Sequence, residues 1–230
     1  MSAIGFRGGL TSPFVCAKKM AVTLDQRPAG WHRRAAEHPG LAGPGAQAGQ
    51  AEDMETGGRA FVAVDVHYLS SGGARAAAVL ATDARFCEVV AERTEVVAEV
   101  LPYRPGEFYL RELPPMRAVL HGLDRLSLLV VDGYADLDPG GRPGLGAHAH
   151  AEFGVPVIGV AKTAFHTATH AVPVLRGTSA RPLFVTAAGM SRDEAAELVR
   201  HMAGQHRLPD AIRRADTLAR TGPAALSAHL

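Results

Sequence analysis

Residues 60–97 set the architecture of this chain, and they read AFVAVDVHYLSSGGARAAAVLATDARFCEVVAERTEVV. The run Ala60–Tyr68 is apolar enough for a buried strand, and Gly72 and Gly73 predict a turn after it. Two further strands are expected over residues 75–82 and 86–97. Because three strands joined by tight turns pair as an antiparallel meander, we predict a sheet that starts with one.

Downstream of the meander, helical and strand patterns alternate. Helices are expected over residues 107–120 and 144–153, after Ser191 and from residue 209, and strands over 126–131, 155–161 and 182–186. Pro114 and Pro115 should start or kink the first helix. Ser191 and Glu194 have the spacing of a capping box. Crossovers of this kind predict an α/β fold, a mixed sheet of antiparallel and parallel strands flanked by helices.

The composition excludes several classes of protein. Lys and Arg number 24 against 23 Asp and Glu, and the net charge of +1 neither requires nor forbids a nucleic-acid partner. Two cysteines, Cys16 and Cys87, are too few for a disulfide framework or a cysteine-based zinc site. The longest apolar runs, such as residues 126–131, are far below the roughly 20 residues of a membrane span. We therefore expect a cytoplasmic globular protein without a membrane partner.

Residues 1–58 differ in composition from the rest of the chain. The stretch 28–50 consists largely of Ala, Gly, Pro, His and Arg, with no periodic apolar pattern. Such a segment lacks the apolar surface that would offset the entropy of ordering it. We predict that residues 1–58 are a disordered arm, or an extension upstream of the true start, with Met20 or Met54 as alternative first residues. The folded domain is then residues 59–230.

Two aspartates stand on strands that are expected to be neighbours. Asp65 lies among valines inside the first strand, where a lone buried carboxylate is costly unless it is paired or binds a metal. Asp132 follows the strand predicted over residues 126–131 and precedes Gly133. In open α/β sheets, ligand crevices form at the carboxyl ends of strands. Ordinary structural explanations exist as well. Asp65 can pair with an Arg or Lys, and Asp132 can simply end a strand before a turn.

Together with a glutamate from the helix after the meander, the two aspartates would form a set of hard oxygen ligands. Such a set suits Mg²⁺ or Mn²⁺, which take carboxylates and keep several waters. A bound Mg²⁺ activates water and shields developing charge in phosphodiester hydrolysis. The residues alone therefore favour a metal centre for that reaction.

Five segments of the chain carry recognisable motifs. They are FVAVDVHY at residues 61–68, PYRPGEFYLRE at 102–112, LVVDG at 129–133, VIGVAK at 157–162 and RLPDAIRRAD at 207–216. In this order they resemble the motifs of the endonuclease V (deoxyinosine 3′ endonuclease) family. The second and fourth segments are the most specific, and they correspond to the family patterns P-Y-I-P-G-x-x-x-x-R-E and I-G-V-A-K. The V-D-G of the third segment would be weak evidence by itself. The resemblance runs from Arg59 to about Arg220, and it implies an RNase H-like fold and a catalytic domain over residues 59–230.

The resemblance also implies a chemistry, that of a Mg²⁺-dependent endodeoxyribonuclease of DNA repair. Such an enzyme cleaves the second phosphodiester bond 3′ to a deoxyinosine, the product of adenine deamination, and Mn²⁺ is an alternative ion. The implied metal ligands are Asp65, Glu112, Asp132 and Asp216, the last at a position that is acidic or histidine in the family. Lys162 would face the scissile phosphate and act in catalysis with the first three carboxylates.

Six residues are implied to contact nucleic acid: Tyr103, Arg104, Gly106, Gly133, His148 and Arg213. Tyr103 has the position of a wedge aromatic, whose ring fills the gap left when a base leaves the stack. The two glycines permit close approach of the backbone, as a tight base pocket needs. Structural roles remain open: a packing residue for Tyr103, a helix-surface histidine for His148, and solvated cations for Lys162 and Arg213.

The chain departs from the family pattern around the expected substrate. Arg104 replaces the isoleucine after the wedge aromatic, Asp138 stands at the second histidine position, and the segment between Lys162 and Pro182 is shortened. The leading hypothesis is an endonuclease acting on DNA that contains deoxyinosine, without an obligate protein partner. The alternatives are a nuclease acting on inosine-containing RNA or structured DNA, and a catalytically weak homologue that binds nucleic acid.

Overall fold

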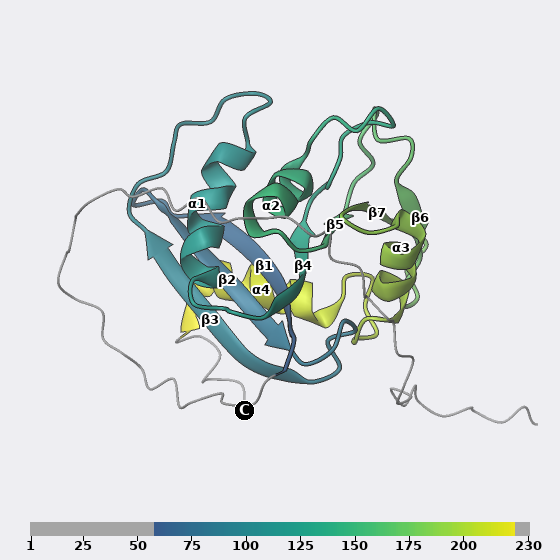
Figure 1. The fold of residues 1–230 in the computed structure, drawn as a ribbon, viewed down its shortest axis with the longest axis horizontal. Helices are drawn as coiled ribbons and strands as arrows, with labels where there is room; N and C mark the ends of the chain where they lie inside the picture. Colours follow the sequence, from purple (N-terminus) through teal and green to yellow (C-terminus); the bar gives the residue numbers. More distant parts are fainter. Residues whose placement is uncertain (1–57, 224–230) are drawn as a thin grey trace, which may run out of the picture. The chain divides into compact units, whose positions relative to one another are not determined.

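The computed structural model describes residues 58–223 of the chain. The predicted N-terminal arm, residues 1–58, lies outside this range except for its last residue. Residues 58–223 form one sheet of seven strands with four helices (Figure 1). None of the helices in that range has the length and apolar character needed to cross a bilayer.

The elements follow the predicted order, with one additional strand. They are β1 (Ala60–Tyr68), β2 (Ala74–Ala81), β3 (Val89–Val97), α1 (Tyr109–Leu120), β4 (Leu126–Asp132), α2 (Leu145–Phe153), β5 (Val157–Ala161), β6 (Val172–Val174), β7 (Leu183–Ala188), α3 (Arg192–His201) and α4 (Asp210–Thr221). The additional strand is β6, which has only three residues and Pro173 at its centre. Proline is typical of edge strands, and β6 lies at the edge of the sheet.

The strands lie in the order β3-β2-β1-β4-β5-β7-β6. The first three form the predicted antiparallel meander. β1, β4 and β5 are parallel, and β7 and β6 continue the sheet as antiparallel strands. The predicted mixed sheet is thus confirmed. Because β1, β4 and β5 are parallel, their carboxyl ends lie at the same edge.

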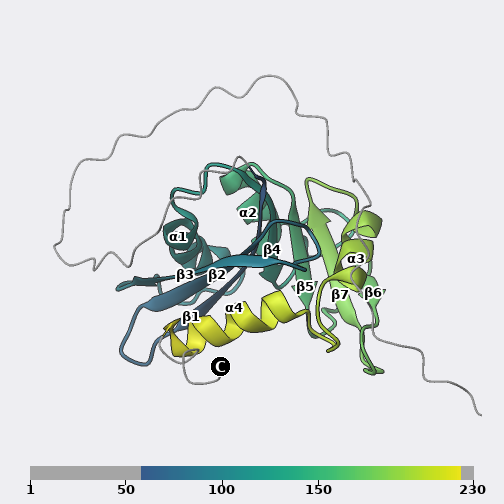
Figure 2. The same ribbon diagram turned by 90° about the horizontal axis from the view of Figure 1, so that it is seen from below.

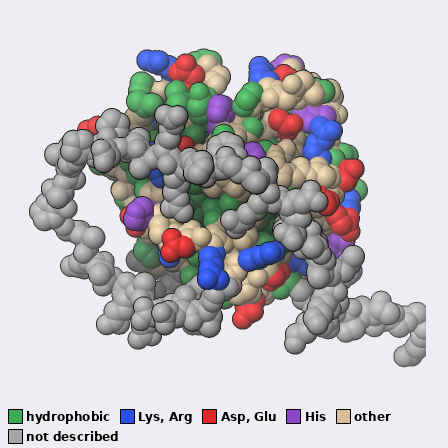
Figure 3. All heavy atoms as spheres, viewed as in Figure 1, with side chains coloured by type: hydrophobic (Ala, Val, Ile, Leu, Met, Phe, Trp, Pro, Cys, Tyr) green, Lys and Arg blue, Asp and Glu red, His purple; other side chains and the backbone are tan. Residues whose placement is uncertain are grey.

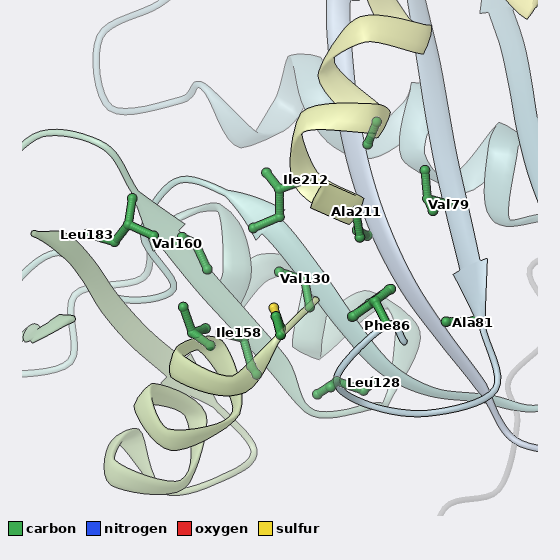
Figure 4. Packing of buried hydrophobic residues seen from close by; sticks show 14 of the residues in the cluster. Val79, Ala81, Phe86, Leu128, Val130, Ile158, Val160, Leu183, Ala211 and Ile212 are labelled. Carbon is green, nitrogen blue, oxygen red and sulfur yellow. The ribbon is translucent and has the colours of Figure 1, made fainter. Parts of the chain in front are cut away.

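Helices α1 and α2 cover one face of this sheet, and α3 and α4 cover the other (Figure 2). Alternate residues of β1 serve the two cores: Val62 and Val64 belong to the core with α1, and Ala63 belongs to the core with α4. Figure 4 shows Ile212 of α4 close to Val130 of β4 in this second core. Burial on both faces explains why the central strands are continuously apolar in sequence.

β3 begins later than the sequence predicts, at Val89 rather than at residue 86. The reason is a turn. Phe86 has a left-handed φ of 56°, and its N–H donates to the carbonyl of Asp83 at 3.1 Å. The Asp83 carboxylate accepts the N–H of Arg85 at 2.8 Å, which stabilises the same turn.

Helix α1 begins at Tyr109, so Pro114 and Pro115 lie inside it and do not start it. Proline has no N–H, so the carbonyls of Leu110 and Arg111, four residues earlier, receive no helical hydrogen bond. The first turn of α1 is therefore attached by an incomplete hydrogen-bond ladder.

The capping box predicted before α3 is confirmed. The Ser191 hydroxyl accepts the N–H of Glu194 at 3.3 Å, and the Glu194 carboxylate accepts the N–H of Ser191 at 3.3 Å. Two N–H groups at the helix start are thereby satisfied, and the helix begins at the residue that follows.

Candidate active site

Asp65 and Asp132 occupy equivalent positions on neighbouring strands. Val64 of β1 pairs with Val131 of β4 in parallel register, and the two aspartates are the next residues of their strands. Val64 and Val131 belong to the core with α1, so the aspartate side chains leave the opposite face, which α4 covers. Neighbouring strands are about 4.8 Å apart, so the two carboxylates interact strongly. The register therefore brings together the two acids that the sequence singles out.

Helix α4 brings a third carboxyl group, that of Asp216, against Asp65. The two groups share a hydrogen bond. Burial, and then the charge of Asp132, raise the pKa of Asp65 to about 7. Burial also acts to raise the pKa of Asp216, but the hydrogen bond and charge of Arg220 outweigh it, so that this pKa is lowered. Below about pH 7, Asp65 is therefore the member of the pair that carries the proton, and the Asp216 carboxylate accepts the hydrogen bond.

Glu112 approaches from the other side of the sheet, on α1. It is 5% exposed, and its carboxylate accepts a hydrogen bond from the Tyr68 hydroxyl. Burial raises the pKa of Glu112 to about 7; Tyr68 and Arg111 oppose this, and the charge of Asp132 adds to it. Asp132 thus acts electrostatically on both Asp65 and Glu112.

Lys162, the residue after β5, supplies a cation at the same edge. Its Nζ donates to Asp132 Oδ2 at 2.5 Å. Burial lowers the pKa of Lys162, but the hydrogen bond and charge of Asp132, followed by the charges of Asp216 and Asp65, outweigh it and raise the pKa. Lys162 is therefore an ammonium ion, and its side chain is 42% exposed to an approaching anion.

The acids of this site are hard oxygen donors, and each is engaged with a neighbouring side chain. As the side chains stand, no three His, Cys, Asp or Glu residues within 58–223 come together as a metal site. Glu112 is bonded to Tyr68, and Asp132 to Lys162. The donors are nevertheless the hard oxygens that Mg²⁺ prefers, and two buried acids have pKa values near 7 partly because of like charge. The donor set therefore fits a divalent cation in its chemistry, although it is not a preformed cage.

The segment before α1 presents an exposed aromatic ring. Tyr103 is 62% exposed, too exposed for a packing residue. The chain then turns: the N–H of Glu107 donates to the carbonyl of Arg104 at 3.0 Å, and Gly106 has φ +83°. A proline at the second position and a glycine with positive φ at the third define a type II turn, so Gly106 is required for its backbone conformation. Arg104 also pairs with Glu107 at 3.7 Å.

His148 of α2 is not a free surface histidine, because its ring stacks on Tyr109. The ring centroids are 3.4 Å apart with an interplanar angle of 10°. Burial lowers the pKa of His148, which favours the neutral imidazole. Tyr109 was not among the residues that the sequence indicates. Gly133, after Asp132, has φ +148° with no atom within 4 Å of where a Cβ would lie, so the space beside it is open.

The last predicted contact, Arg213 of α4, is ion-paired and lies 3.8 Å from Asp210. Asp138, which departs from the family pattern, is ion-paired as well, 3.4 Å from Arg142. In the coloured part of the face in Figure 3, basic side chains likewise lie among acidic ones, without a large area of one sign. A nucleic-acid backbone would have to compete with these partners.

The sheet order, the covered faces and the neighbouring acids of β1 and β4 define an RNase H-like fold. The crystal structure of endonuclease V from Streptomyces avermitilis is similar, with a TM-score of 0.59 and 30% identity over 76% of this chain and 84% of that one. The crystal structure of human ENDOV has a TM-score of 0.60 and 25% identity, over 75% of this chain and 87% of that one. A Ciona intestinalis endonuclease V, in complex with DNA containing an inosine followed by a ribo-adenosine, shares the fold, with a TM-score of 0.62 at 19% identity over 73% and 86% of the two chains.

Sequence comparison shows the family. The family model described as Endonuclease V matches residues 46–180. Endonuclease V of Streptomyces coelicolor is 37% identical over 179 residues, which are 68% of this chain and 76% of the relative. That of S. avermitilis is 33% identical over 178 residues, 68% of this chain and 77% of the relative. The chain belongs to the endonuclease V family, as its five motifs predict.

Proposed function

We propose that this chain is a Mg²⁺-dependent endonuclease of DNA repair that cleaves the second phosphodiester bond 3′ to a deoxyinosine. The observation that carries the proposal is that Asp65 of β1 and Asp216 of α4 interact with Asp132 and Lys162 at the carboxyl ends of β4 and β5. Membership of the endonuclease V family supports it. A further support is that a relative from Ciona intestinalis was crystallised with inosine-containing DNA. We propose that the enzyme works in the cytoplasm without an obligate protein partner.

Asp65, Glu112 and Asp132 would hold the Mg²⁺ ion, with Asp216 as a further ligand. When bound, the ion activates water and shields the charge that develops on the phosphate. The acids themselves need a counter-charge, because burial with like charges raises the pKa values of Asp65 and Glu112 to about 7. The Lys162 ammonium can donate a charge-assisted hydrogen bond to an oxygen of the scissile phosphate. When substrate enters, this bond would replace the one that Lys162 now makes to Asp132.

The exposed ring of Tyr103 would act on the DNA rather than on the reacting bond. A planar ring that enters the stack replaces the stacking that a duplex gives up when a base is extruded. The open space beside Gly133, at the end of β4, would receive the backbone of the extruded nucleotide. His148, neutral and stacked on Tyr109, can give or accept one hydrogen bond to a base edge without adding charge.

One observation favours a second candidate function. Asp138, which stands where the family has a histidine, is paired with Arg142 at 3.4 Å. The family resemblance implies that this position lies near the base pocket, so the change alters the region expected to select the substrate. The second candidate is therefore a nuclease that uses the same catalytic centre on inosine in RNA. The two candidates share the acids and Lys162, and they differ in the sugar beside the scissile bond.

The test is a cleavage assay on labelled duplex and single-stranded oligonucleotides, each with one deoxyinosine, in Mg²⁺ or in EDTA. A Mg²⁺-dependent nick one nucleotide beyond the lesion is expected. Asp132→Ala should abolish it, because Asp132 interacts with Asp65, Glu112 and Lys162 together. Asp124→Ala is the matched control, since Asp124 is an exposed acid before the same strand.

Cutting that persists in Asp132→Ala, or in EDTA, would refute the metal-dependent mechanism. Cutting of the matching inosine-containing RNA, without cutting of DNA, would select the second candidate. Binding of both nucleic acids without any cutting would refute both nucleases.

A further inference from the structure

We propose that Arg207 is a positioning residue that holds Lys162 for catalysis, an inference that rests on the proposed nuclease function. Arg207 lies in the connection between α3 and α4, far from Lys162 in sequence. Its guanidinium donates to the carbonyl oxygen of Lys162 and, at 2.7 Å, to that of Pro182. These are main-chain contacts, so they act on where the backbone of Lys162 lies.

The two carbonyls are at the end of the ladder between β5 and β7. Ala161 pairs with Phe184; Lys162 follows β5, and Pro182 precedes β7. Beyond the last ladder pair these carbonyls need another donor, because a main-chain acceptor without a partner costs free energy. A guanidinium has five N–H groups in a fixed plane and can serve both. Arg207 thus closes the end of the strand pair from which Lys162 projects.

Lys162 is then held at both ends. Arg207 fixes its carbonyl, and Asp132 accepts its Nζ at 2.5 Å. A lysine side chain has a flexible stem of four carbons, so the place its ammonium reaches depends on a fixed backbone. Misplacement of a catalytic group by about 1 Å can cost on the order of 100-fold in rate. Loss of Arg207 should therefore slow the step in which Lys162 meets the phosphate.

Arg176 provides the matched control. It is 5% exposed, and like Arg207 it donates to main-chain carbonyls: those of Gly204 at 3.1 Å and His206 at 3.3 Å among others. Its hydrogen bonds within residues 58–223 all go to the connection after α3, and none to Lys162. A purely structural loss in this region should look like Arg176→Gln.

The experiment measures kcat and KM on a deoxyinosine oligonucleotide at a temperature where circular dichroism shows each protein to be folded. The proteins are the wild type, Arg207→Gln, Arg207→Lys, Arg176→Gln, Lys162→Ala and the double variant Lys162→Ala/Arg207→Gln. Arg207→Gln should lower kcat about tenfold with KM nearly unchanged. Arg207→Lys, which keeps a cationic donor, should recover part of the loss. In the Lys162→Ala background, Arg207→Gln should cost nothing more, because Arg207 acts through Lys162.

Losses that multiply in the double variant, or a kcat for Arg207→Gln no lower than for Arg176→Gln, would overturn the proposal. Amide hydrogen exchange tests the positioning without cleavage. Arg207→Gln should speed exchange in residues 160–163, and Arg176→Gln should not. If the wild type cuts no inosine substrate while this exchange pattern appears, the proposed function fails and the positioning stands; unchanged exchange in residues 160–163 overturns the positioning itself.

Discussion

The carboxyl groups of Asp65 and Asp216 share one hydrogen bond, which joins strand β1 to helix α4 at the edge where the acids gather. Their pKa values move in opposite directions: that of Asp65 is raised to about 7, and that of Asp216 is lowered. Below about pH 7, one proton is therefore held between two acids that would otherwise repel each other. A metal ion bound by Asp65 must displace that proton, so protons and metal compete for the site.

Without metal, the protein should become less stable as the pH rises. The folded pKa values of Asp65 and Glu112 are about 7, against 3.8 and 4.5 for the free groups. The unfolded chain releases these protons near pH 4, whereas the folded chain keeps them to about pH 7, so their stabilising contribution is complete below about pH 4 and is lost as the pH approaches 7. In EDTA, the Tm of Asp65→Asn relative to the wild type should therefore rise between pH 5 and pH 8. A constant difference, as expected for Asp124→Asn, would contradict this.

Mg²⁺ should stabilise the folded protein at pH 8. An ion that binds only the folded state at 100 times its Kd adds about 2.7 kcal/mol. Differential scanning fluorimetry should show a higher Tm with Mg²⁺ for the wild type and a much smaller rise for Asp132→Asn. Isothermal titration calorimetry of Mg²⁺ into both proteins measures the same difference directly. Equal responses of the two proteins would argue against Asp132 as a ligand.

Tyr103→Ala should weaken recognition of the lesion and leave the fold intact. The ring is 62% exposed, so its removal costs little packing. Base stacking on an aromatic side chain contributes about 1–3 kcal/mol, so affinity for a deoxyinosine duplex should fall by roughly tenfold or more, and affinity for an undamaged duplex should change little. Fluorescence anisotropy with both duplexes measures this. Tyr103→Phe keeps the ring and should bind like the wild type; equal losses on both duplexes would rule out a wedge.

Tyr109→Leu should release His148 from its stack. Burial lowers the pKa of His148, and the Tyr109 ring is stacked on the imidazole at 3.4 Å, so the pKa should rise towards its ordinary value when that ring is removed. Stability should fall by about 1 kcal/mol, the usual contribution of an aromatic pair. NMR titration of the His148 ring protons gives the pKa, and Tyr109→Phe serves as the control. An unchanged pKa in Tyr109→Leu would mean that other neighbours bury the ring.

The sequence predicted those elements well whose signal lies in adjacent residues. The apolar run of β1, the glycine turn and the capping box of α3 each depend on a few adjacent residues, and all three are present. β6 was missed because three residues with a central proline show no alternation. The Tyr109–His148 stack could not be foreseen, because it depends on how α1 and α2 are rotated against each other. The sequence also indicated roles for Asp132 and Lys162 but not their pairing, which depends on β4 and β5 being neighbours in the sheet.

The two prolines of α1 give Glu112 a freedom that the aspartates lack. The turn that carries Glu112 is joined to the rest of the helix by fewer main-chain hydrogen bonds than an ordinary first turn, because Pro114 and Pro115 cannot donate. Local opening costs less where fewer such bonds must break. We expect that turn to tilt as a unit, so that Glu112 exchanges Tyr68 for an incoming ligand while the strands stay still. Asp65 and Asp132 would then stay fixed in the sheet, while Glu112 moves with the first turn of α1.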